Sequence, residues 1–352
     1  MVGRLRSICL LMGAPDLFFL LATLLSFAND LQKLTIEPFD FQLENDPATY
    51  IRGLWGLYIQ EDILYIIPKN DPYVLQIDPK TKAMKRIGGK GLGPGELGHS
   101  FPWGLSLGES SMWVLDTYRA RASFYKDGVF HTSFKVKNYQ ISGSTDPKYA
   151  FAHNGLFVVI PAFPASKALA NVYDYSGELV QKLGHILPLD EEMLKYNPAV
   201  NDTIWRFHKG NWYCLFVYRP IIQIYDALFE LKKEIQIVGP EVDLFEERFH
   251  QMEVDPLIKA PAPHFTDFQV TSSNLLVMCM GVLYQMDHQG KVLSRTGFYG
   301  NRDIEAAVGY KPRVHFGHAV VNSRGRVYLG AQGEFYFDHD LWFVDAPHLK
   351  AD

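Results

Sequence analysis

Short runs of apolar and aromatic residues recur along most of the chain, and a polar turn separates each run from the next. In each repeating unit one run ends on an aspartate, and these aspartates are Asp78, Asp127, Asp174, Asp226, Asp287 and Asp345. Successive aspartates are 49, 47, 52, 61 and 58 residues apart. Short runs that are rich in β-branched and aromatic residues predict β-strands. The regular spacing predicts one structural unit that is repeated six times.

Each unit contains a second apolar run that begins after a short polar turn. These runs cover residues 63–66, 112–115, 156–159, 212–215, 275–278 and 326–329. In three units a glycine turn follows the aspartate and leads into a further strand, at Gly128, Gly177 and Gly290. Glycine supplies the positive φ that a tight hairpin needs. The unit is therefore a four-stranded antiparallel sheet.

Six such sheets predict an all-β fold, a six-bladed β-propeller with four-stranded antiparallel blades, extending over residues 34–347. One blade cannot bury both of its faces, whereas six blades in a ring bury one another and leave few free edges. We expect residues 35–39 to pair with the last blade and close the ring. We also expect short helical insertions between blades, at residues 189–194, 242–252 and 303–308.

The best-defined unit contains a glycine-rich linker at residues 87–97, an inner strand at 101–107 and further strands at 112–116 and 121–128. This pattern resembles the NHL-repeat and TolB-like six-bladed propellers, especially exported bacterial members. That superfamily includes gluconolactonases, strictosidine synthases, peptidyl-hydroxyglycine lyases and binding scaffolds, so the resemblance implies a fold but no single function. The lyases place a metal-binding histidine on the inner strand, where this chain has Trp103 and, in the first unit, Trp55. This difference argues against that lyase activity.

Composition narrows the class of protein further. Of the 352 residues, 47% are hydrophobic and 21% charged, which excludes a disordered chain. The net charge of −5 argues against nucleic-acid binding. We expect a monomer that binds either a small molecule or a protein. Cys214 and Cys279 lie in strand-like runs, and they are either buried thiols or one disulfide.

Residues 1–28 have the pattern of a secretory signal peptide. Arg4 and Arg6 precede apolar residues, and small residues at Ser26 and Ala28 fit a cleavage site. The apolar run that follows Asp16 is too short to span a bilayer. We therefore expect an exported protein, periplasmic or extracellular, with no stable membrane span beyond this segment. An uncleaved N-terminal anchor is the alternative.

Two motifs suggest chemistry that their context does not support. Ser106 lies in a GxSxG pattern, but the next residues predict a hairpin, whereas a nucleophile elbow requires a helix there. The glycines between Gly88 and Gly95 lack the Lys-Ser/Thr and the helix of a phosphate-binding loop. We interpret the first as an inner strand and the second as a linker between blades.

The ligand site of such a propeller is expected at one mouth of the central channel. Loops from strand 2 to strand 3 and connections between blades form that face, and inner strands line the channel. The candidate residues are Trp55, Trp103, Arg119, Arg121, Arg206, Arg219, Asp267 and His318. Arginine suits carboxylates and tryptophan suits sugar rings, so an anionic or sugar-like ligand is expected.

We interpret the chain as a non-enzymatic binding module with no catalytic residue, no metal ligand and no cofactor. One alternative is a metal-assisted lactonase or lyase of the gluconolactonase type. It would use calcium held by inner-strand carboxylates, for which the sequence offers Asp267. The other alternative is a platform for protein docking.

Overall fold

The computed structural model gives the arrangement of most strands. It describes residues 31–39, 54–69, 71–98, 104–108, 111–116, 119–137, 150–153, 155–160, 168–184, 186, 201–244, 265–299, 316–330 and 341–350. The predicted signal peptide, Trp103 and the predicted helices at 189–194 and 303–308 lie outside these residues. In the part of the chain that is described, no helix is long and apolar enough to cross a membrane.

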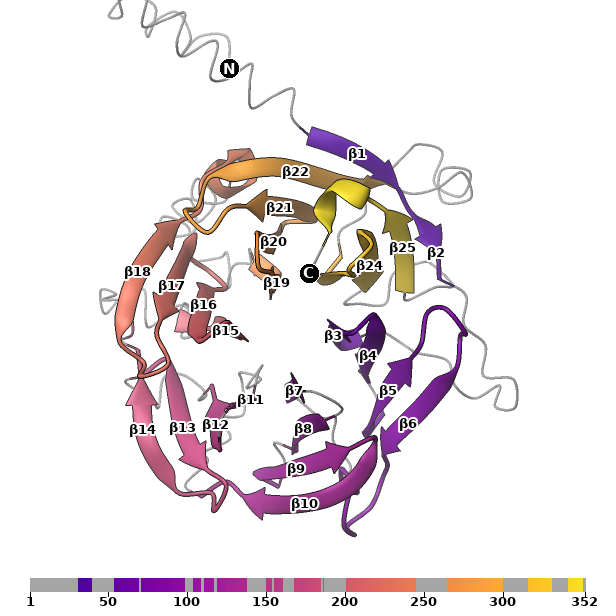
Figure 1. Cartoon of the computed structure of the whole chain (residues 1–352), viewed down its shortest axis with the longest axis vertical. Coiled ribbons are helices and arrows are strands. Elements are labelled where there is room, and N and C mark those ends of the chain that lie inside the picture. Colours follow the sequence, from indigo (N-terminus) through magenta and orange to yellow (C-terminus); the bar gives the residue numbers. More distant parts are fainter. Residues whose placement is uncertain are drawn as a thin grey trace, which may run out of the picture.

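Six sheets form a ring around a central axis, which confirms the six-bladed β-propeller (Figure 1). Four blades contain consecutive strands only. Blade 1 contains β3 (Leu54–Gln60), β4 (Ile63–Pro68), β5 (Tyr73–Ile77) and β6 (Met84–Gly88), and blade 2 contains β7 (Gly104–Gly108), β8 (Ser111–Asp116), β9 (Arg121–Lys126) and β10 (Val129–Lys135). Blade 3 contains β11 (Ala150–His153), β12 (Leu156–Val159), β13 (Ala170–Asp174) and β14 (Leu179–Leu183). Blade 4 contains β15 (Thr203–His208), β16 (Asn211–Phe216), β17 (Ile221–Tyr225) and β18 (Leu231–Gln236).

The last two blades include strands from the start of the chain. Blade 5 has β19 (Phe265–Val270), β20 (Leu275–Cys279), β21 (Val282–Met286) and β22 (Val292–Tyr299), and β1 (Leu31–Thr35) adds to β22 in parallel. Blade 6 has β23 (His318–Val321), β24 (Arg326–Gly330) and β25 (Leu341–Asp345), and β2 (Glu37–Pro38) pairs antiparallel with β25. The predicted closure through residues 35–39 is confirmed, whereas the parallel strand β1 was not predicted.

The hydrophobic core lies between blades. One cluster of buried side chains joins Leu57 and Leu75 of blade 1 to Tyr328 of blade 6, and another joins Trp113 of blade 2 to Phe157 of blade 3. Ile36, between β1 and β2, is fully buried in the cluster that blades 5 and 6 share. Each blade therefore buries its apolar faces against its neighbours, as the repeat pattern requires.

Helices are almost absent from the described residues. The segment predicted as a helix at 242–252 is helical at residues 240–244, and its remainder lies outside the description. A 3-10 turn, η2 (Pro347–Leu349), follows the last strand.

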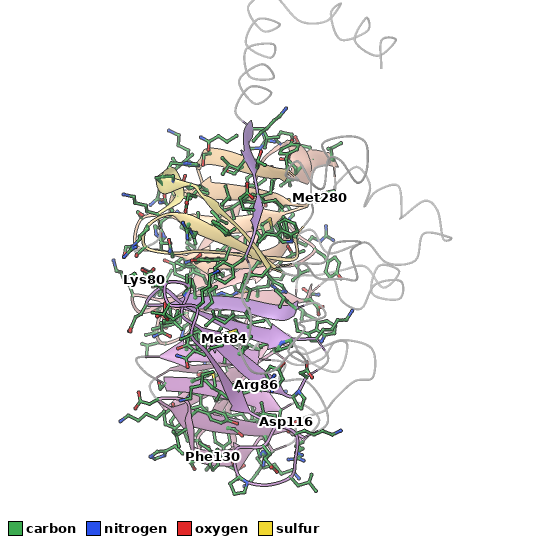
Figure 2. All side chains as sticks on the ribbon, turned by 90° about the vertical axis from the view of Figure 1, so that its right-hand side faces the viewer. Lys80, Met84, Arg86, Asp116, Phe130 and Met280 are labelled. Atoms are coloured by element: carbon green, nitrogen blue, oxygen red, sulfur yellow. The ribbon has the colours of Figure 1, made fainter. Side chains whose placement is uncertain are left out.

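The two faces of the ring differ in their connections. The turn face contains the turns from strand 1 to strand 2 and from strand 3 to strand 4, among them those at residues 61–62, 78–83 and 287–291. The connection face contains the links from strand 2 to strand 3 and between blades, such as Asp116 and Met280. Figure 2 shows Lys80 of the turn face at the left edge and Met280 towards the right.

The recurring aspartates shape the turns that join strand 3 to strand 4. In three blades the Oδ1 of Asp174, Asp226 or Asp287 accepts hydrogen bonds from the backbone N–H groups two and four residues later, over 2.8–3.1 Å. Asp78 accepts two similar bonds. Hydrogen bonding to the charged form lowers the pKa of all four carboxyl groups. These bonds explain physically why four of the six units end on aspartate.

We expect Asp287→Ala to lower the thermal unfolding midpoint, because two backbone N–H groups lose their acceptor. Asp287→Asn should lower it less, since an amide oxygen can accept the same bonds, as Asn322 does from Arg324 and Arg326. The folded-state pKa of Asp287 is depressed, so its contribution is present at neutral pH and disappears as the pH falls through that value.

Thermal melts at pH 7 and at pH 3 test this prediction, with Asp243→Ala at an exposed site as the control. Equal midpoints for Asp287→Ala and the wild-type protein at pH 7 would contradict the assigned role of the turn.

Candidate functional site: the axial cavity

A cavity of about 840 Å³ lies on the axis of the ring. Its wall comes from the inner strands β3, β7, β15, β19 and β23 and from the turns that follow β3, β19 and β23. Because these residues belong to the second half of each strand and to the turns, the cavity lies at the turn face. The mouth expected from the sequence is on the connection face, and most of its loops lie outside the described residues.

Arg206, Asp267 and His318 meet beside this cavity and join three successive blades. Arg206 Nη2 donates to Asp267 Oδ1 over 3.0 Å, and His318 Nδ1 lies 3.4 Å from Asp267 Oδ2. Their side chains are 17%, 3% and 4% exposed. The inner strands β15, β19 and β23 place them at one level of the channel. Three of the predicted site residues are therefore in contact.

The carboxylate of Asp267 is fully occupied by protein donors. Its Oδ1 also accepts the Phe268 N–H over 2.7 Å, and its Oδ2 accepts the Ala319 N–H over 3.2 Å. A calcium ion at Asp267 would have to displace these donors and approach the Arg206 guanidinium. Among the described residues, no group of three or more His, Cys, Asp or Glu side chains could hold a metal ion.

Tyr58 reaches the same level from the opposite side of the ring. The Arg206 guanidinium lies 5.9 Å from the centre of the Tyr58 ring. Burial raises the pKa of the Tyr58 hydroxyl well above its usual value, and the positive charge of Arg206 opposes that rise only in part. The hydroxyl is therefore neutral at physiological pH and acts as a polar, uncharged group in the wall.

Gln269 satisfies the free edge of the neighbouring inner strand. Its Nε2 donates to the Val321 carbonyl over 3.0 Å, and its Oε1 accepts the Val321 N–H over 2.8 Å. Two residues earlier, the Asp267 carboxylate accepts the N–H of Ala319 in a similar way. Both side chains thus cover backbone groups of β23 that no further strand can pair.

At the mouth of the axial cavity, hydrogen bonds to Asp62 join blade 1 to blade 6. Its Oδ1 accepts the Ser323 N–H over 3.1 Å, and Ser323 Oγ donates to both carboxylate oxygens over 3.0 Å. Glu61 and Asp62 both have positive φ, 51° and 61°. This tight turn fixes the rim of the cavity.

The other predicted site residues that the structure describes lie apart from this cavity. Trp55 Nε1 donates to the Lys69 carbonyl over 2.9 Å, and the Lys69 ammonium lies 5.6 Å from the Trp55 ring. Arg219 is in the link from β16 to β17, on the connection face. Trp103 is outside the described residues.

Arg119 and Arg121 hold the glycine-rich linker between blades 1 and 2. Arg119 Nη2 donates to the Gly91 carbonyl over 2.7 Å, and Arg121 Nη2 donates to the Glu96 carbonyl. At Gly95 φ is 75°, and a Cβ there would lie 2.7 Å from Phe130. The linker interpretation of Gly88–Gly95 is confirmed, and in this structure both arginines bond to backbone carbonyls of that linker.

Two open questions from the sequence are settled. Ser106 lies within the inner strand β7, so the GxSxG pattern is not a nucleophile elbow. Cys214 and Cys279 are separate, buried thiols, which excludes the disulfide. Burial raises the pKa of the Cys214 thiol well above its usual value.

Tyr58, Gln60 and Gln269 were not predicted as wall residues. The available signal was polar side chains within apolar strands that begin each blade. Strand 1 of a propeller blade faces the axis, so its polar residues are either structural bridges, as Gln269 is, or potential ligand contacts.

Comparison with known proteins supports the fold and does not extend to a family. No family model and no curated protein matches the chain. A Bacteroides vulgatus protein of the DUF4221 family is similar in structure, with a TM-score of 0.52 and 10% identity over 89% of this chain and 96% of that one. A Bacteroides fragilis protein that is predicted to be exported has a TM-score of 0.51 and 11% identity over 86% and 88%.

A catalytically inactive virginiamycin B lyase from Staphylococcus aureus, solved with quinupristin, is also similar. Its TM-score is 0.50, with 10% identity over 89% of this chain and 94% of the lyase. At these identities the similarity shows the shared six-bladed β-propeller alone.

We expect Asp267→Ala to lower the free energy of unfolding by up to about 3–5 kcal/mol, because the partly buried Arg206 guanidinium loses its partner. Asp267→Asn should cost less, since its amide oxygen can still accept a hydrogen bond. Urea unfolding followed by tryptophan fluorescence measures the difference. A loss no larger than that of the exposed Asp243→Ala variant would show that this contact does not join the blades.

Proposed function

We propose that the chain is an exported, non-enzymatic binding module of the NHL-like or TolB-like kind, and that its axial cavity takes a neutral polar ligand such as a sugar. The observation that supports this most is the wall of the cavity, which combines amide, hydroxyl and apolar side chains with few charges. Its volume of about 840 Å³ falls within the range of small-molecule sites.

The charges in the wall favour a neutral ligand over an anionic one. The described wall contains the carboxylates of Glu61 and Asp62 and one guanidinium, that of Arg206. Asp267 already pairs with that guanidinium. An anion would therefore meet more negative than positive charge, and the basic loop residues Arg119 and Arg121 bond to the linker instead.

A ligand with hydroxyl groups would satisfy the polar part of the wall. Gln60 Oε1 is buried and has no hydrogen-bond partner among the described residues. A buried acceptor of this kind is costly unless a donor reaches it, and a rotation of the Gln60 amide towards the cavity would bring it to a hydroxyl group of the ligand. Phe207, which is half-buried, supplies apolar surface that suits the C–H face of a sugar ring.

Export rests on two observations of different kinds. Residues 1–28 have the sequence pattern of a signal peptide. A protein of the same fold from Bacteroides fragilis is itself predicted to be exported. Whether the segment is cleaved or retained as an anchor changes where the module acts and leaves the cavity the same.

A metal-assisted enzyme finds less support at this site. Asp267, the carboxylate that such an enzyme would use, already receives an arginine and two backbone N–H groups. A protein-docking platform would use the broad faces of the ring and would not need a polar axial cavity.

We expect neutral monosaccharides to raise the thermal unfolding midpoint more than matched anions do. Glucose against glucuronate and galactose against galacturonate are suitable pairs, at equal concentration and ionic strength. Gln60→Leu should weaken the binding of the best sugar about tenfold, since one hydrogen bond to the ligand is lost.

Gln236→Leu, at an exposed position on β18, makes the same chemical change away from the cavity and serves as the control. A larger shift with the uronates would contradict the proposed ligand class. No shift with any sugar would contradict the proposed function.

A further inference from the structure

A second, smaller cavity lies next to the first on the turn face. Its volume is about 370 Å³, and it lies between blades 1 and 2, bounded by the β3–β4 turn and the β9–β10 turn at Asp127 and Gly128. Gln60 and Glu61 line both cavities. These two residues therefore form a wall that the axial cavity and the smaller cavity share.

The smaller cavity repeats the chemistry of the larger one. Tyr65 provides an aromatic ring, and its hydroxyl accepts a hydrogen bond from Gln76 Nε2 over 3.4 Å. Burial and the nearby charge of Glu61 raise the pKa of the Tyr65 hydroxyl, so this group stays neutral. An aromatic ring, an amide and a carboxylate in one pocket suit the C–H face and the hydroxyl groups of a sugar.

The outer wall of this cavity is held by a contact between blades. Lys85 Nζ, from β6 of blade 1, donates to the Asp127 carbonyl of blade 2 over 2.7 Å. At Gly128 φ is 68°, and a Cβ there would lie 2.5 Å from Lys85 Nζ. Because Gly128 has no side chain, Lys85 can lie against the Asp127–Gly128 turn, and the two together form this wall of the cavity.

The shared wall is fixed in position from the other side. Asp62, next to Glu61, is bound to Ser323 of blade 6. Glu61 and Asp62 both have positive φ, which places them in a tight two-residue turn. A ligand that crosses the wall therefore meets a preformed surface, and binding does not need a loop to become ordered.

We infer that the two cavities are adjoining subsites for one extended ligand, an oligosaccharide with one unit on the axis and the next between blades 1 and 2. This inference rests on the proposed sugar-binding function and adds the length of the ligand and its direction. Gln60 and Glu61 contact both units at the junction, whereas Tyr65 and Gln76 contact the second unit alone.

Calorimetric titration with a homologous series tests the inference. The probes are glucose, galactose, mannose and N-acetylglucosamine, each with its linked dimer and trimer. For the sugar that binds best we expect the dimer to bind about tenfold more tightly than the monomer, because the second subsite adds contacts at little extra entropic cost.

Variants separate the two subsites. Gln76→Leu and Tyr65→Phe should lower the affinity for the dimer more than the affinity for the monomer, whereas Gln60→Leu should weaken both. Gln236→Leu is the matched control for the glutamine changes. If the monomer binds and the dimer binds no more tightly, the second subsite is wrong and the proposed function stands. If no sugar of any length binds, both are wrong.

Discussion

The pairing of β2 with β25 closes the ring, and the position of every other element depends on that closure. Glu37 and Pro38 come from the start of the chain and complete the blade built by its end. Ile36 is fully buried beside them in the core that blades 5 and 6 share. Without closure, blades 1 and 6 would each expose one apolar face, and the Asp62–Ser323 contact at the rim could not form. The axial cavity is therefore a consequence of closure as much as of the residues that line it.

Closure also brings together inner strands whose edges no further strand can pair. Asp267 and Gln269 cover the backbone of β23 at Ala319 and Val321. Side chains that look like ligand contacts on the axis thus have two different roles. Asp267 and Gln269 join blades, whereas Gln60 has a buried acceptor without a partner among the described residues. The proposed function depends on this distinction, because Asp267 and Gln269 are already bonded to protein groups, whereas we propose that the Gln60 amide turns towards a ligand in the cavity.

Much of the fold was predictable because each blade carries its own local signals. Four of the recurring aspartates mark turns in which the carboxylate accepts backbone N–H groups, and such a turn needs no knowledge of the rest of the chain. The contact of Arg206, Asp267 and His318 was partly foreseeable, since equivalent positions on inner strands lie at one level of the axis. The parallel strand β1 and the bonds of Arg119 and Arg121 to the linker could not be predicted from the sequence. They depend on which segments the closed ring brings together. The sequence therefore predicted an anionic or sugar-like ligand, whereas the proposed ligand is neutral.

A cysteine pair across the closing strands tests this account most directly. In the variant Glu37→Cys with Phe343→Cys, the two residues are register partners on β2 and β25. We expect mild oxidation of the native protein to form the disulfide and to raise the unfolding midpoint above that of the same variant when reduced, since the bond closes a loop of about 300 residues. The single variant Glu37→Cys should show no such difference. If both thiols stay free in the native protein, β2 does not pair with β25 and the ring is not closed in this way.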